Sequence, residues 1–141
     1  MNVTDGTHVY MRAPVNETNE PLFQYTLMPT HMRSMFDVSD FKDLQVSPPF
    51  DFTKDASVMK IACQTWRCRD HAFDNLLWNI ARAPEQAQPL TDPDQEQRLI
   101  RLMTALMKEC DVPAEQYVRL GLTIPGDKNG NQNNDMGVRN E

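Results

Sequence analysis

Residues 92–110, DPDQEQRLIRLMTALMKEC, carry the clearest structural signal in this sequence. Asp92 is suited to cap a helix, Pro93 to its first turn, and Gln95 stands three positions after Asp92, as in a capping box. The apolar side chains that follow have the spacing of one helix face; they are Leu99, Leu102, Met103, Leu106, Met107 and Cys110. We therefore expect an amphipathic helix that starts at Asp92.

The residues after this helix predict a tight turn and a second, short helix, so that residues 91–121 form a helix, a turn and a helix. Asp111 is suited to cap the short helix, with Pro113 in its first turn. Gly121 fits the left-handed position that often ends a helix. The apolar face of the short helix would consist of Tyr117, Val118 and Leu120.

Residues 55–83 show a second helical pattern. Asp55 or Ser57 is suited to the cap, and Pro84 ends the pattern. The apolar residues between them have helical spacing; they include Phe73, Leu76, Leu77, Ile80 and Ala81. This stretch predicts one long helix or two short ones. The expected fold is therefore mainly α, with a helical hairpin or three-helix module over residues 55–121.

Residues 1–54 predict an extended N-terminal arm. They hold five of the ten prolines in the chain and no sustained apolar period. Proline removes a backbone donor and fixes φ, which disfavours helices and central strands. Ordering such a segment costs about 1.5 kcal/mol per residue, more than packing against a small helical module can offset. We expect this arm to have no core of its own, and either to be held by a partner or to stay disordered.

The arm nevertheless carries large apolar side chains, unlike the polar tail predicted for residues 122–141. Aromatic and methionine side chains are adaptable contacts at protein interfaces. We therefore predict partner binding by seven residues of the arm, which are Phe23, Tyr25, Met28, Phe36, Phe41, Phe50 and Phe52.

Composition argues against several classes of partner. The formal net charge is −6 and the basic residues are dispersed, so we expect no direct nucleic-acid binding. No apolar run approaches the roughly 18 residues of a membrane span. The N-terminus has no apolar signal-peptide region, and an odd number of cysteines, three, favours free thiols.

The only metal-like spacing of cysteines and histidines is that of Cys63, Cys68 and His71. Zinc takes four ligands in structural sites, and no fourth ligand stands nearby. Buried thiols and a surface histidine are therefore the preferred interpretation. The polar run that starts at Asp127 resembles a calcium loop, but Gln132 and Val138 occupy the positions that require Gly and Glu.

No catalytic motif or cofactor site is recognisable, so we expect no enzyme and no cofactor. The leading hypothesis is a structural or assembly subunit of a virion, such as a capsid-associated, connector or tail protein, assembled in the host cytoplasm. Its arm would lie along neighbouring protein subunits, in a homo-oligomer or another multi-chain assembly. The alternative is a cytoplasmic adaptor or regulatory protein whose N-terminal half folds on one partner. A small enzyme or metal protein built around Cys63, Cys68 and His71 is a third hypothesis.

Overall fold

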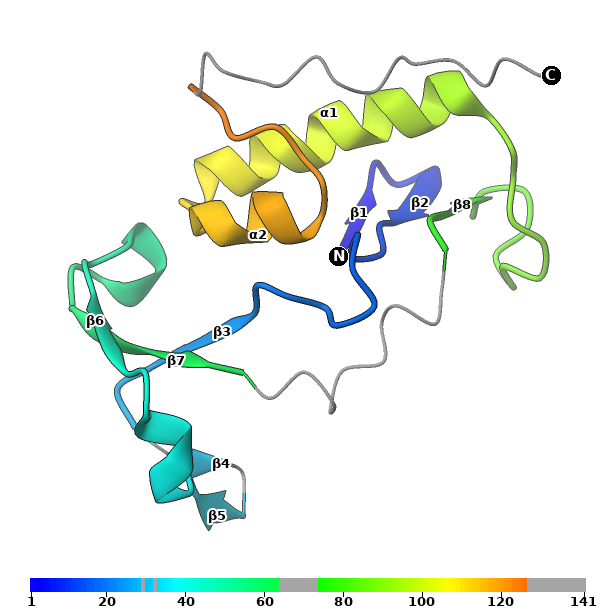
Figure 1. Cartoon of the computed structure of the whole chain (residues 1–141). Coiled ribbons are helices and arrows are strands. Elements are labelled where there is room, and N and C mark those ends of the chain that lie inside the picture. Colours follow the sequence, from blue (N-terminus) through cyan, green and yellow to red (C-terminus); the bar gives the residue numbers. More distant parts are fainter. Residues whose placement is uncertain (29, 32, 64–73, 127–141) are drawn as a thin grey trace, which may run out of the picture.

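The computed structural model describes residues 1–28, 30–31, 33–63 and 74–126 (Figure 1). These residues form two three-stranded antiparallel sheets, a two-stranded hairpin and two α-helices. The prediction of a mainly α, three-helix fold is therefore wrong, because strands outnumber helices in the part of the chain described.

The first sheet joins segments far apart in the sequence, in the order β1 (Asn2–Thr4), β2 (His8–Met11) and β8 (Leu76–Asn79). Its register aligns Val3 with Tyr10 and Tyr10 with Leu77. All three side chains are buried in one hydrophobic core. The N-terminal strands thus contribute to the core instead of forming an extended arm.

The helices are α1 (Pro93–Glu109) and α2 (Ala114–Arg119). The Asp92 cap is confirmed, since its Oδ1 accepts from the Gln95 amide at 3.1 Å. The cap expected at Asp111 is wrong. Asp111 instead has φ +51° in the turn after α1, and Pro113 holds the position before α2.

Sheet and helices share one core, in which α1 covers the first sheet and α2 packs beside it (Figure 1). The Tyr10 hydroxyl donates to Glu96 Oε1 at 2.8 Å, which ties β2 to α1. The buried members of the core are Val3, Tyr10, Leu77, Leu99, Met103, Met107, Tyr117 and Leu120. We call the first sheet with α1 and α2 the body.

The segment between β2 and the second sheet lies against α2. The Val15 amide donates to the Arg119 carbonyl at 3.0 Å, and Arg119 Nη1 donates to Asn19 Oδ1 at 2.6 Å. Both side chains of the second pair are buried. Arg12 Nε donates to the Leu120 carbonyl at 2.6 Å. The contacts to the Arg119 and Leu120 carbonyls use backbone groups that the end of a helix leaves unpaired.

Residues 23–62 form a second part, which we call the lobe. Its sheet has the order β3 (Phe23–Thr26), β7 (Val58–Ala62) and β6 (Gln45–Ser47). Between these strands lie the hairpin β4 (Thr30–His31) and β5 (Ser34–Met35) and the 3-10 helices η1 (Val38–Phe41) and η2 (Asp51–Thr53). Phe36, Val58 and Ile61 are buried within this part.

The helix expected over residues 55–83 is wrong, because β7 and β8 occupy its two ends and belong to different sheets. Residues 64–73, which include Phe73 of the expected apolar face, lie outside the described residues. The spacing of Leu76, Leu77 and Ile80 fits a helix face, but pairing of β8 with β2 overrides this local pattern.

Candidate partner-binding surface

The seven residues predicted to bind a partner all lie in the lobe. Phe23 and Tyr25 are on β3, Phe41 is in η1, and Phe52 is in η2. The others are Met28 after β3, Phe36 after β5 and Phe50 before η2. Of the seven, Met28 and Phe52 are exposed and Phe36 is buried, while the rest are half-buried.

Four of these residues form an aromatic cluster, which consists of Phe23, Tyr25, Phe50 and Phe52. The rings of Tyr25 and Phe50 meet edge to face with centroids 5.4 Å apart, and Phe50 stacks on Phe52 at 4.9 Å. Lys60 Nζ lies 4.2 Å from the Phe23 ring centroid. The cation and the rings attract each other at this distance.

Glu115 of α2 meets the aromatic cluster from the body. Its carboxylate accepts a hydrogen bond from the Tyr25 hydroxyl and pairs with Lys60 Nζ at 3.2 Å. Burial alone would raise the pKa of Glu115, but hydrogen bonds from Tyr25, its own backbone amide and Lys60 hold the pKa below the ordinary value. Burial of Tyr25, together with its hydrogen bond to Glu115 and the negative charge of that residue, raises the pKa of Tyr25. The pair is therefore an ionised carboxylate and a neutral tyrosine at neutral pH.

Phe36 and Phe41 form a separate pair, with ring centroids 5.9 Å apart. The two rings are tilted against each other; Phe36 is buried and Phe41, in η1, is half-buried. The structure thus brings six of the seven predicted residues together in two groups, and leaves Met28 outside both. Of the seven, only Phe52 and Met28 are exposed. Their binding to a partner stays a prediction.

Most of the exposed large hydrophobic side chains described also belong to the lobe, although several were not among the predicted residues. Val38 is 86% exposed, Val46 77% and Met35 73%. We call the whole set the exposed apolar surface of the lobe; it comprises Leu27, Met28, Met35, Val38, Leu44, Val46 and Phe52. Exposed apolar side chains that gather into one patch typically mark a surface that binds other molecules.

Sequence patterns did not reveal Val38 and Val46. Each is a single apolar residue between polar neighbours, and an isolated valine is compatible with either burial or exposure. A signal did exist for Met35, because it belongs to the group of methionines around Met28 and Met32 in the sequence. Methionines in a segment without a strong core are typical of adaptable interfaces.

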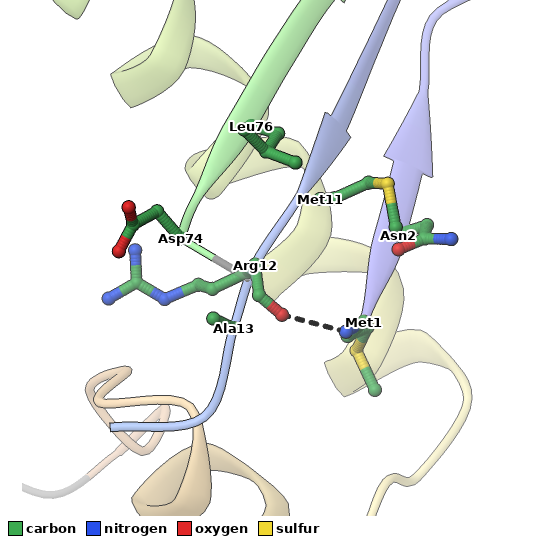
Figure 2. Close-up of a pocket in the computed structure, with 7 residues that line it drawn as sticks. All are labelled: Met1, Asn2, Met11, Arg12, Ala13, Asp74 and Leu76. Carbon is green, nitrogen blue, oxygen red and sulfur yellow. Dashed lines mark hydrogen bonds between the residues drawn. The ribbon is translucent and has the colours of Figure 1, made fainter. Parts of the chain in front are cut away.

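A pocket of about 360 Å³ lies at the end of the first sheet (Figure 2). The Met1 amino group donates to the Arg12 carbonyl at 2.8 Å beside it. The Arg12 guanidinium already donates to the carbonyls of Leu120 and Gly121 and to the Tyr10 hydroxyl. The remaining charged group of the lining is Asp74. This arrangement supports the fold and offers no pair of groups placed for proton transfer.

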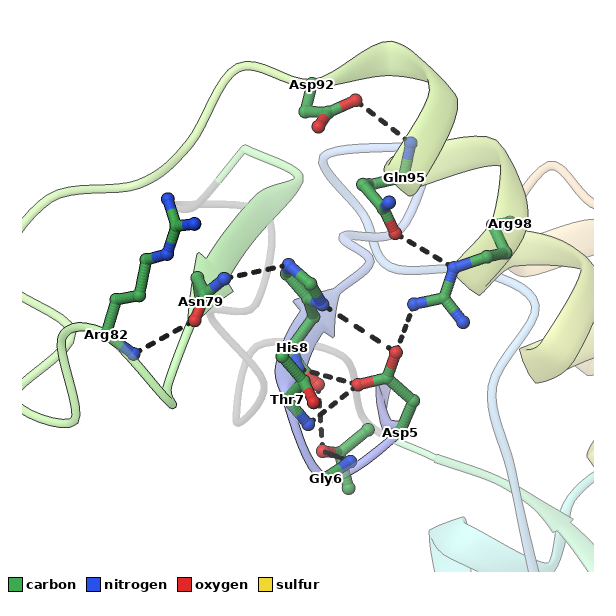
Figure 3. A network of polar contacts seen from close by, with 10 residues as sticks. Asp5, Gly6, Thr7, His8, Asn79, Arg82, Asp92, Gln95 and Arg98 are labelled. Carbon is green, nitrogen blue, oxygen red and sulfur yellow. Dashed lines mark hydrogen bonds and ion pairs between the residues drawn. The ribbon is translucent and has the colours of Figure 1, made fainter.

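A polar network joins the turn between β1 and β2 to β8 and α1 (Figure 3). Asp5 Oδ1 accepts from the amides of Thr7 and His8 at 2.8 and 2.6 Å, and Oδ2 pairs with Arg98. His8 Nε2 lies 3.1 Å from Asn79 Nδ2, and His8 Nδ1 lies 3.7 Å from Asp5 Oδ2. Asn79 holds the ring of His8, while the buried Nδ1 of His8 lies within ion-pair range of Asp5 without a hydrogen bond. This fits a structural role better than that of a general base.

No group of three or more metal-ligating side chains occurs among the residues that the structure describes. Cys63 is half-buried and Cys110 exposed. Cys68 and His71, the other members of the suggested metal group, lie outside the described residues, as does the run from Asp127. The metal hypothesis therefore stays untested.

No family model, curated protein or solved structure matches this chain. Within the described ranges, neither helix combines the length and apolar character needed to cross a membrane.

Proposed function

We propose that this chain is a non-enzymatic structural subunit of a multi-copy assembly, such as a virus particle. Its lobe binds a second copy of the chain through the exposed apolar surface. The observation that carries the proposal is the concentration of exposed large hydrophobics between Leu27 and Phe52. Association would remove this surface from water, at about 25 cal/mol for each Å² buried.

A second copy is the preferred occupant for two reasons. Most soluble oligomers are built from identical chains. The described residues of the lobe also offer no recognisable catalytic constellation, and Lys60 of the lobe is paired with Glu115 of the body. An adaptor that binds one different protein is the competing hypothesis, and stoichiometry separates the two.

The test is sedimentation velocity of the full chain over a concentration series. The wild type is expected to form multi-copy species. A variant with Met35→Ser, Val38→Ser and Val46→Ser should associate at least 100-fold more weakly, because 100-fold corresponds to about 2.7 kcal/mol and three side chains of this kind contribute more than that when buried.

The matched control replaces three exposed apolar residues outside the lobe, with Val15→Ser, Leu90→Ser and Val118→Ser. This variant should assemble like the wild type. A wild-type chain that stays monomeric at every concentration contradicts the proposal and favours the adaptor. Equal weakening by both variants contradicts the assignment of the interface to the lobe.

A further inference from the structure

The lobe and the body do not share a hydrophobic core. The described core of the body draws its residues from the first sheet, α1, α2 and the segments beside them, and none comes from residues 23–62. Phe36, Val58 and Ile61 of the lobe are buried but are not members of that core. Parts with separate cores can change their relative orientation unless specific contacts hold them.

The polar contacts between the two parts converge on α2 and the turn before it. Glu115 receives both the Tyr25 hydroxyl and Lys60 Nζ. Near Glu115, the Asp51 amide donates a longer hydrogen bond to Asp111 Oδ2, at 3.3 Å. A single carboxylate of the body thus accepts from two side chains of the lobe.

The second sheet positions the two donors, Tyr25 and Lys60, side by side. Tyr25 on β3 and Lys60 on β7 are directly paired in the register, so their side chains project from the same face of the sheet. Lys60 is also held over the Phe23 ring. Because both donors are fixed before Glu115 arrives, little side-chain entropy is lost when the contact forms, and a charge-assisted hydrogen bond is stronger than a neutral one.

We propose that Glu115 is a latch that fixes the orientation of the lobe on the body, and that its release lets the lobe reorient while both parts stay folded. The inference does not depend on which molecule binds the lobe.

The experiment measures the distance between the two parts by pulsed electron paramagnetic resonance. One spin label is attached to the exposed Cys110 and the other to Asp43→Cys in the lobe, with Cys63 and Cys68 replaced by serine. We expect one narrow distance distribution for the parent chain. Glu115→Ala should lose it and give a broad distribution with a shifted maximum, whereas Glu115→Gln, which keeps an acceptor oxygen, should lie between the two.

The control is Asp94→Ala, which removes a carboxylate from the first turn of α1 without touching the lobe. It should leave the distribution narrow. Tyr25→Phe combined with Lys60→Met removes the same contacts from the other side and should reproduce the effect of Glu115→Ala.

Thermal unfolding monitored by circular dichroism accompanies each variant. A distribution that stays narrow in both latch variants overturns the inference. Complete unfolding of both variants also overturns it, because a latch between parts with separate cores must leave the body folded.

Discussion

In the turn between β1 and β2, the side chain of Asp5 holds two backbone amides and one arginine in place. Its carboxylate receives the amides of Thr7 and His8 and pairs with Arg98 on α1 (Figure 3). The hydrogen bond from Arg98, followed by those from the His8 and Thr7 amides, holds the pKa of Asp5 well below its usual range. A carboxyl group with a lowered pKa in the folded state stabilises the fold in its ionised form.

The stabilisation from Asp5 should therefore be present at neutral pH and decline as the pH falls below the ordinary carboxyl value of about 4. We expect Asp5→Asn to lower the melting temperature at pH 7 and to make it less dependent on pH below 4. The measurement is thermal unfolding followed by circular dichroism between about pH 2 and 7, which spans the range in which carboxyl groups titrate. Glu85→Gln, at an exposed loop carboxylate, should keep the wild-type pH dependence. An unchanged profile for Asp5→Asn would show that the pair with Arg98 contributes nothing.

Among the elements, α2 ends in a way that only glycine accommodates well. Gly121 has φ +61°, and the amides of Gly121 and Leu122 donate to the carbonyls of Val118 and Tyr117 at 3.0 and 2.8 Å. This is the Schellman arrangement. A Cβ atom at Gly121 would lie 2.6 Å from Val15 Cγ1.

We expect Gly121→Ala to reduce the free energy of unfolding by about 1–3 kcal/mol, as overpacking of a close contact does. Gly6→Ala is a matched control, since Gly6 also has a positive φ but no atom lies within 4 Å of its Cβ position. Its smaller loss would isolate the cost of the clash from the cost of the backbone conformation. Urea unfolding measures both variants. Equal losses would mean that Val15 moves aside freely.

The elements also show which parts of the fold can be read from the sequence. Both the start of α1 and the end of α2 were predictable, because Asp92 and Gly121 act within a few residues of themselves. The strands were not, because β2 is stable only when paired with β8, and residues so far apart leave no common local pattern. The helical spacing around Leu77 arises from a strand whose two faces are both covered, which reads as a continuous apolar run.

Only part of the candidate surface could be predicted, because the sequence gives residue types but not their tertiary placement. Aromatic residues such as Tyr25 and Phe50 are recognisable in the sequence as large apolar groups, but their sequestration in the lobe depends on β3, β7 and Lys60. Exposure of Val38 and Val46 is a tertiary property, which composition and spacing do not encode.

The whole molecule consists of a body with a sheet-and-helix core and a lobe with several exposed large apolar side chains. The two are connected by the contacts of Glu115 with Tyr25 and Lys60. In the proposed assembly, the body would hold the lobe in position while the lobe binds a second copy of the chain. Such a division of roles suits an assembly component.

Hydrogen–deuterium exchange of the full chain, compared below and above its association concentration, tests the claim that the lobe is the interface between copies. We predict that amides of residues 27–52 exchange more slowly in the assembled state, because a second copy excludes water from the exposed apolar surface, and that amides of α1 exchange at unchanged rates. Slower exchange confined to the body, or no difference between the two concentrations, would contradict the claim.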